Sequence, residues 1–298
     1  MKINNRLDRS FSPFAPPQVA EAIKRTKNST AAGPNGITAL HLKHLGPKGL
    51  RFLTRLFTLS ICDADIPVIW RSADIVPVPK PGKPLDQGLS YRPISLLCPE
   101  IKVLERLLIP FLTTNFHLNP TQHGFRPQRS TVTALIPLAT SIPRGFNQPK
   151  PASRTGLLSV DISKAFNVVR RELLLKKIDE TQLDPNIKRW FLAYLMDRRV
   201  RVIYQGAVSK WKKSKLGMPQ GAVSSPPLWN LFGKDLRVEV VELALSYADD
   251  FHGATSNSDT DVISKRLNQV VDEMAAWADN NEMLRWANPL IFCLTPDN

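Results

Sequence analysis

The residues with the clearest chemistry in this sequence are aspartates. Asp249 and Asp250 are adjacent in Tyr-Ala-Asp-Asp, between the apolar run ELALS and the short segment FHGAT. Aspartate is depleted from strands, and two like charges about 4 Å apart repel by about 4 kcal/mol at an effective dielectric constant near 20. The pair therefore predicts a positive partner such as a metal ion.

Asp161 ends another apolar run, GLLSV, and is the natural third carboxylate. Successive strand side chains alternate between faces, so one of Asp249 and Asp250 should face the site squarely and the other should reach it from the edge. Carboxylates are the hard oxygen ligands that Mg²⁺ prefers. Two such ions about 4 Å apart would activate a 3′-hydroxyl and stabilise a leaving pyrophosphate, which is nucleotidyl transfer. The alternative is a plain hydrophilic turn.

The elements around these aspartates predict an α+β fold. Alternating apolar patterns predict strands over residues 156–162 and on both sides of the turn within 243–255. Helical periodicity predicts helices over 226–241 and 261–281. Together they indicate an antiparallel sheet backed by helices.

The N-terminal half has its own pattern of elements. Helices are expected over residues 19–27, 40–62 and 99–117, and a strand within 73–84 leads into a Lys/Pro/Gly loop. Residues 143–155 have the composition of a linker. The subdomain boundary is therefore expected there, with 1–150 as a basic extension and fingers and 151–298 as a palm carrying the carboxylates.

Charge is unevenly distributed along the chain of 298 residues. The net charge of +14 divides into +12 over residues 1–150, with 20 basic and 8 acidic side chains, and +2 over the rest, with 20 and 18. A basic half favours a polyanionic partner, although a solvated basic face is the alternative. The three cysteines are too scattered for a disulfide framework or a zinc site. No signal peptide or membrane span is expected, which predicts an intracellular protein, cytoplasmic or nuclear.

An ordered series of motifs resembles the reverse transcriptases of non-LTR (LINE-type) retrotransposons. The series covers nearly the whole chain, from about residue 31 to 289. Its blocks are AAGPNGI, KPGKP with SYRPISLL, QHGFRPQRST, SVDISKAFNVV, GMPQGAVSSP, SYADD and WADNNEMLRWANP. The resemblance implies the fingers and palm of a right-hand polymerase, extending a DNA primer with dNTPs on an RNA template.

The resemblance also implies residue roles. Asp161, Asp249 and Asp250 would hold two Mg²⁺ ions, with Mn²⁺ as an alternative. Phe166 would lie under the incoming sugar and exclude a 2′-hydroxyl, although an ordinary core Phe would look the same. The residues implied to contact the nucleotide, by triphosphate binding or by lining its site, are Lys80, Arg92, Gln220 and Gly221. Arg126 and Arg129 match template-backbone contacts, with a solvated loop as the alternative.

Other residues depart from the family pattern or favour a structural role. Asn167 stands where the family has Asp, and Ser224 stands where an aliphatic residue is usual. After Asn288 and Pro289 the family has a lysine that neutralises or protonates the leaving pyrophosphate, and here Leu290 follows. No thumb, endonuclease region or Cys/His knuckle is expected. Trp190, Phe191 and Tyr194, at helical spacing, favour a core over a stacking platform.

Two rival functions stay open. One is a catalytically inactive nucleic-acid-binding remnant of a retroelement, which keeps the fold and the positive surface. The other is an RNA-dependent RNA polymerase, which shares the palm chemistry but usually has Gly before its Asp pair and lacks a bulky gate. No membrane partner is expected, and protein partners are not predicted.

Overall fold

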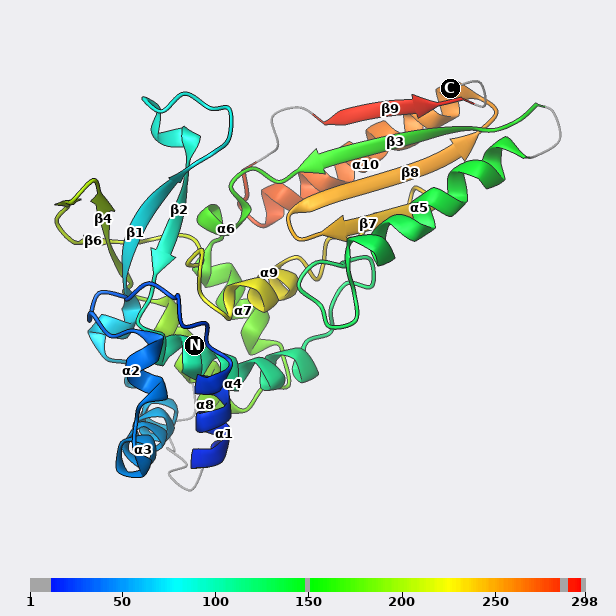
Figure 1. Ribbon diagram of the computed structural model, residues 1–298. Helices are drawn as coiled ribbons and strands as arrows, with labels where there is room; N and C mark the ends of the chain where they lie inside the picture. The colour runs from blue at the N-terminus through cyan, green and yellow to red at the C-terminus, as the bar shows by residue number, and fades with distance from the viewer. Residues whose placement is uncertain (1–11, 148–150, 285–288, 296–298) are drawn as a thin grey trace. The chain divides into compact units, whose positions relative to one another are not determined.

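The structure, a computed structural model, describes residues 12–147, 151–284 and 289–295 and confirms a mixed α+β fold (Figure 1). These residues form two compact units. Unit 1 contains the described residues up to Phe116 together with Arg171–Ser225, and unit 2 contains the described residues of His117–Arg170 and Pro226–Asn298. The boundary expected near residue 150 falls inside unit 2, because the elements on both sides of it pack in one unit.

Unit 1 combines a helical layer with a mixed sheet. Proline at the first or second helical position begins α1, α3, α4 and α8, where a missing N–H costs nothing. The helices are α1 (Pro16–Lys24), α2 (Ala39–Lys43), α3 (Pro47–Asp63), α4 (Pro99–Asn115), α7 (Arg171–Asp179) and α8 (Pro185–Leu195). Trp190, Phe191 and Tyr194 are fully buried on α8, which confirms their place in the core.

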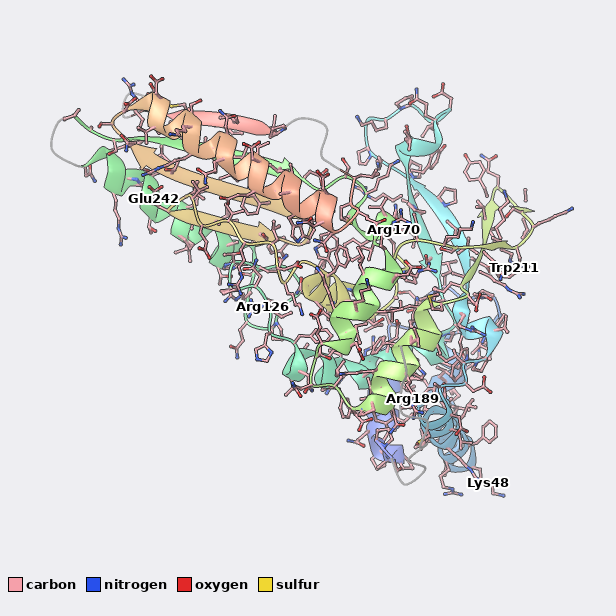
Figure 2. The ribbon with its side chains drawn as sticks, turned by 180° about the vertical axis from the view of Figure 1, so that it is seen from behind. Lys48, Arg126, Arg170, Arg189, Trp211 and Glu242 are labelled. Carbon is pink, nitrogen blue, oxygen red and sulfur yellow. The ribbon has the colours of Figure 1, made fainter. Side chains whose placement is uncertain are left out.

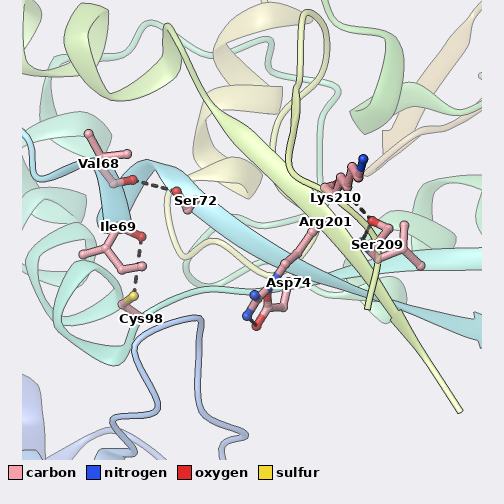
Figure 3. Close-up of polar contacts among 9 residues, drawn as sticks. Val68, Ile69, Ser72, Asp74, Cys98, Arg201, Ser209 and Lys210 are labelled. Atoms are coloured by element: carbon pink, nitrogen blue, oxygen red, sulfur yellow. Dashed lines mark hydrogen bonds and ion pairs between the residues drawn. The ribbon is translucent and has the colours of Figure 1, made fainter. Parts of the chain in front are cut away.

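The sheet of unit 1 is built on a hairpin. Strands β1 (Ser72–Pro79) and β2 (Tyr91–Leu96) pair antiparallel, and β4 (Arg199–Tyr204) pairs parallel with β1. The short strands β5 (Ala207–Val208) and β6 (Lys212–Lys213) both pair with β4. Arg201 on β4 forms an ion pair of 2.6 Å with the buried Asp74 on β1, which fastens the two strands (Figure 3).

Unit 2 holds a four-stranded antiparallel sheet in the order β7-β8-β3-β9. The strands are β3 (Arg154–Asp161), β7 (Leu243–Tyr247), β8 (Asp250–Asn257) and β9 (Leu290–Leu294). Helices α5 (Thr131–Phe146), α6 (Ala165–Val168), α9 (Ser225–Phe232) and α10 (Thr260–Asn280) complete the unit. In Figure 1, α10 runs behind this sheet.

Helix α10 covers one face of that sheet closely. A Cβ added at Gly156 of β3 would lie 2.3 Å from the Ile263 side chain of α10, so glycine is required for this approach. Helix α5 packs on the other face, where Gly145 approaches Ser256 of β8. The buried side chains between these layers include Leu158 and Val160. Helices therefore pack on both faces of the sheet. The C-terminal end of β3 and the β7–β8 turn lie at the same end of the sheet.

Two helix predictions were wrong. Residues 40–62 form α2 and α3 rather than one helix, because Gly46 and Pro47 break it and restart it. The helix expected over 226–241 ends at Phe232, just before Gly233, and the following apolar residues Leu236 and Val241 are buried without helical structure.

Candidate active site

Two of the three predicted carboxylates are cross-strand neighbours on one face of the sheet. Asp161 is the last residue of β3 and Asp250 is the first residue of β8, and they are direct partners in the antiparallel register. Directly opposite residues share a face, with Cβ atoms about 4.5–5.5 Å apart. The predicted convergence of Asp161 with the turn is therefore present in the backbone.

Asp249 lies in the tight turn between β7 and β8. Ala248 and Asp249 form this turn, and the Asp249 carbonyl accepts a hydrogen bond of 3.2 Å from the Ile162 N–H just beyond β3. Ala248 has a φ of 58°, in the left-handed region that disfavours residues with a Cβ. The turn is thus strained at the residue that precedes the carboxylate pair.

Burial and neighbouring negative charge raise the pKa of two of these carboxylates. Burial raises the pKa of Asp249, and the charges of Asp250 and Asp161 raise it further. The pKa of Asp250 is raised by partial desolvation and by the charge of Asp161, while His252 acts in the opposite direction. This environment disfavours the charged forms of Asp249 and Asp250. A cation bound at this end of the sheet would therefore be stabilised by their negative charge.

The carboxylate pair fits a magnesium ion in chemical type. Mg²⁺ commonly takes one or two protein carboxylates and completes its shell with water and phosphate oxygens. Asp161 and Asp250, on one face and both exposed, offer such a pair. Among the described residues, no group of three His, Cys, Asp or Glu side chains is arranged to hold one ion. Joint binding by all three aspartates stays a prediction.

Phe166 lies in α6, five residues after Asp161. Its ring contacts Trp229 at 5.4 Å and Phe125 at 6.0 Å between centroids, and the side chain is half-buried. Packing on two aromatic rings fixes the ring while leaving part of it open. This placement is compatible with both the sugar gate and the core role.

Arg126 and Arg129 have structural contacts in the loop before α5; Figure 2 labels Arg126. The Arg126 guanidinium donates to the carbonyls of Asn119 and Gln122 at 2.9 and 3.1 Å. Arg129 donates to the carbonyl of Pro120 at 2.6 Å. Both arginines therefore hold this loop, and contact with a template stays a prediction.

The predicted phosphate-binding residues share one hairpin of unit 1. Arg92 on β2 is opposite Val78 of β1, and Lys80 follows two residues later. Residues two apart on a strand share a face, so Lys80 and Arg92 are diagonal neighbours. Arg92 is exposed, and the Lys80 ammonium donates to the Leu89 carbonyl at 3.1 Å.

Gln220 and Gly221 dock on the same strand. The Ser95 N–H of β2 donates to the Gln220 carbonyl at 2.7 Å. Gly221 has a φ of 123°, and a Cβ there would lie 2.7 Å from the Ser95 carbonyl oxygen, so only glycine fits. The β1–β2 hairpin thus carries Lys80 and Arg92, and the segment with Gln220 and Gly221 packs against β2 of the same hairpin.

A buried carboxylate that was not predicted supports this segment. Glu105 of α4 is fully buried and accepts hydrogen bonds from the Ser224 hydroxyl at 2.5 Å and the Val223 N–H at 2.9 Å. Ser224 therefore has a structural reason to replace an aliphatic residue. The sequence held no signal for this pair, because the two residues are 119 positions apart.

The closing motif lies partly outside the described residues. Asn288 is not among them, whereas Leu290 begins β9 opposite Ser159 of β3, with its side chain 59% exposed. Strand β9 was not predicted. It places an aliphatic side chain beside the strand that carries Asp161, where a lysine was expected from the family pattern.

Residues 78–284 match the family model described as reverse transcriptase (RNA-dependent DNA polymerase). The chain is 32% identical over 254 residues to the probable RNA-directed DNA polymerase from transposon X-element of Drosophila melanogaster, covering 82% of this chain and 28% of that protein. It is 28% identical over 279 residues to the probable RNA-directed DNA polymerase from transposon BS of the same species, covering 90% and 30%.

A third Drosophila melanogaster relative, the RNA-directed DNA polymerase from mobile element jockey, is 28% identical over 275 residues, covering 88% of this chain and 30% of that protein. The chain thus spans less than a third of the length of these relatives. None of the helices in the described ranges is long and apolar enough to span a bilayer.

Proposed function

The chain belongs to the reverse transcriptase (RNA-dependent DNA polymerase) family, as a LINE-type domain, and from this we propose that it extends a DNA primer with dNTPs on an RNA template. The observation that carries the proposal is the register of β3 with β8. It pairs Asp161 with Asp250 next to a turn that contains Asp249. The proposed partners are the template RNA, the primer and the dNTPs.

In this proposal Asp161, Asp249 and Asp250 hold two Mg²⁺ ions, with Mn²⁺ able to replace them. The ions would activate the primer 3′-hydroxyl and neutralise the leaving pyrophosphate. The acidic side chains would orient the ions. Burial, and after it the charges of neighbouring aspartates, raise the pKa values of Asp249 and Asp250, and this supports a cation-binding role.

Residues of unit 1 would bind the nucleotide. The guanidinium of Arg92 can bind phosphate oxygens in bidentate fashion, and Lys80 adds a second positive charge on the same face. Gln220 and Gly221 would line the nucleotide and template site. We propose that this hairpin belongs to the fingers and the four-stranded sheet of unit 2 to the palm.

Primer extension tests the proposal. The full chain, an RNA template, a DNA primer, dNTPs and Mg²⁺ should give extended primer, and Asp249→Ala should reduce the rate at least a thousandfold. Asp272→Ala, an exposed substitution on α10, is the matched control and should retain the wild-type rate. Extension that is equal in Asp249→Ala and wild type would contradict the proposal.

A second candidate function is nucleic-acid binding without catalysis. Leu290, at the start of β9, favours it, because leucine cannot neutralise or protonate pyrophosphate. The same assay separates the two functions. RNA binding by a wild-type chain that gives no extension would favour the inactive remnant.

The sugar gate separates a DNA polymerase from an RNA polymerase. Phe166→Val should raise kcat/KM for ribonucleotides relative to deoxynucleotides by roughly 10- to 200-fold, the range expected when a steric contact in a pocket is removed. Phe125→Leu, which changes the neighbouring ring instead, is the control. Ribonucleotide use by wild type that does not change in Phe166→Val would favour the RNA polymerase.

A further inference from the structure

Two side chains of unit 2 converge on the backbone of a single residue in the β7–β8 turn, Ala248. The Ala248 N–H donates to Gln122 Oε1 at 3.0 Å, and Gln122 Nε2 donates to the Ala248 carbonyl at 3.0 Å. The Trp229 indole N–H donates to the same carbonyl at 2.8 Å. Both polar groups of the Ala248 backbone are thus bound by side chains from outside the hairpin.

The backbone of residues 122–124 packs directly against β7 and the turn, and this places the Gln122 side chain beside Ala248. Gln122 makes a parallel bridge with Ser246, and the His123 N–H donates to the Ser246 carbonyl at 2.7 Å. A Cβ at Gly124 would lie 2.2 Å from the Ala248 nitrogen. The Gln122 loop therefore packs against β7 and the turn so closely that a glycine is required.

Further contacts orient Gln122 and Trp229. Gln122 Oε1 also accepts from the Gly124 N–H at 2.8 Å, and its backbone carbonyl accepts from Arg126 at 3.1 Å. The Trp229 ring is held between Phe166 at 5.4 Å and Phe232 at 6.1 Å. Gln122 and Trp229 are both buried, at 8% and 2% exposure. Each reaches Ala248 from a well-fixed position.

The turn needs such support for two reasons. Ala248 has a left-handed φ of 58°, a conformation that costs a residue with a Cβ on the order of 1 kcal/mol. The next two residues are carboxylates that repel each other and Asp161. Without the hydrogen bonds to Ala248, the turn would be held near Asp161 only by the pairing of Asp250 with Asp161 and by the Ile162 N–H bond to the Asp249 carbonyl.

We propose that Gln122 and Trp229 are positioning residues that fix the Ala248 backbone and thereby the placement of Asp249 and Asp250 relative to Asp161. The consequence for the reaction rests on the proposed function, whereas the effect on the turn does not. Misplacement of a catalytic group by about 1 Å can reduce turnover a hundredfold.

Two substitutions test the role, with one matched control. Trp229→Phe keeps a ring between Phe166 and Phe232 and removes the indole N–H. Gln122→Met keeps a side chain of similar length and removes its hydrogen bonds to Ala248 and Gly124. The control is Trp190→Phe, which removes another buried indole N–H, the one donated to Ser60 Oγ at 3.2 Å in the core of unit 1.

The first measurement is hydrogen–deuterium exchange of the full chain, with the Ala248 amide resolved. Gln122→Met should exchange at Ala248 at least tenfold faster than wild type, because that amide loses its acceptor. Exchange along the strands β3 and β8 away from the turn should not change, and Trp190→Phe should match wild type at Ala248. Wild-type exchange at Ala248 in Gln122→Met would overturn the proposal.

The second measurement is steady-state primer extension. We expect kcat to fall about tenfold in Trp229→Phe and about a hundredfold in Gln122→Met, with KM for the dNTP within threefold of wild type. Trp190→Phe should retain the wild-type kcat per folded molecule. Unchanged kcat in a Gln122→Met chain with fast exchange at Ala248 would overturn the positioning role. If wild type is inactive, the proposed function fails, and the exchange measurement alone decides whether Gln122 fixes the turn.

Discussion

The charges of Asp249 and Asp250 come at a cost to the stability of the fold. The pKa of Asp249 is raised by burial and by the two neighbouring charges. A carboxylate with a higher pKa in the folded than in the unfolded chain binds its proton more tightly when folded. The free energy of unfolding therefore decreases as the pH rises from the pKa of Asp249 in the unfolded chain to its higher pKa in the folded chain. At neutral pH the charge destabilises the fold.

The stability cost gives the first prediction. Asp249→Asn should raise the melting temperature at pH 7 without divalent ions by about 1–4 °C, because it removes a repelled and partly buried charge. Calorimetry with and without Mg²⁺ measures the effect. The difference should shrink below the ordinary pKa of 3.8, where the carboxylates are protonated, and Mg²⁺ should stabilise wild type more than the variant. A lower melting temperature in Asp249→Asn at pH 7 would contradict this reading.

At the residue scale, the sequence predicts the proposed catalytic carboxylates but not the residues that contact their turn. Asp161, Asp249 and Asp250 were identified by residue type and by their places at strand ends. Gln122 contacts Ala248 across 126 residues, through hydrogen bonds to backbone atoms that no side-chain pattern encodes. Its only sequence signal is its place in the QHGF block, two residues before the glycine that packs on the turn.

At the element scale, the β1–β2 hairpin is where the predicted triphosphate-binding residues meet. Lys80 and Arg92 share a face because the register pairs Val78 with Arg92. An exposed guanidinium on a hairpin contributes little to folding, so its substitution should act on nucleotide binding alone.

The second prediction concerns Arg92 on strand β2 of this hairpin. Arg92→Ala should raise KM for the dNTP by roughly 10- to 100-fold, since a charge-assisted hydrogen bond contributes about 1.5–3 kcal/mol, and should leave the melting temperature within 1–2 °C of wild type. Steady-state kinetics and calorimetry measure both quantities. Lys83→Ala, at the exposed tip of the same hairpin, serves as the control. An unchanged KM in Arg92→Ala would remove it from the nucleotide site.

Predictions of helices and strands were confirmed where the hydrophobic periodicity agreed with the turn-forming residues at the ends of the element. The tight turn between β7 and β8 and the long helix α10 were both predicted, and both exist. The helix expected over 226–241 was wrong because its apolar residues are buried in an irregular segment after Gly233, and periodicity does not distinguish the two kinds of burial. Strand β9 was missed because its run of exposed apolar residues has no alternation, and only pairing with β3 makes it a strand.

At the scale of the whole molecule, the chain passes between the two units three times, at residues 116/117, 170/171 and 225/226. A single boundary near residue 150 followed from composition, because Pro-rich and polar residues are typical of linkers. The grouping into compact units depends on which distant segments pack together, and local composition carries no information about that.

The net charge of +14 gives the third prediction. Binding of an RNA–DNA hybrid should weaken at least tenfold between 50 and 200 mM salt, because basic side chains that neutralise phosphates release counterions. Fluorescence anisotropy of a labelled hybrid at several salt concentrations measures the slope. Affinity that does not depend on salt would show that the basic residues form a solvated face instead of a binding surface.

The central claim is that Asp161 and Asp250, paired across β3 and β8, hold a divalent ion. Titration of the full chain with Mn²⁺, followed by electron paramagnetic resonance of the free ion, tests it without any assay of polymerase activity. We predict binding by wild type, at least a tenfold loss of affinity in Asp161→Asn and in Asp250→Asn, and wild-type affinity in the exposed control Asp272→Asn. Equal Mn²⁺ affinity in all four proteins would contradict the claim.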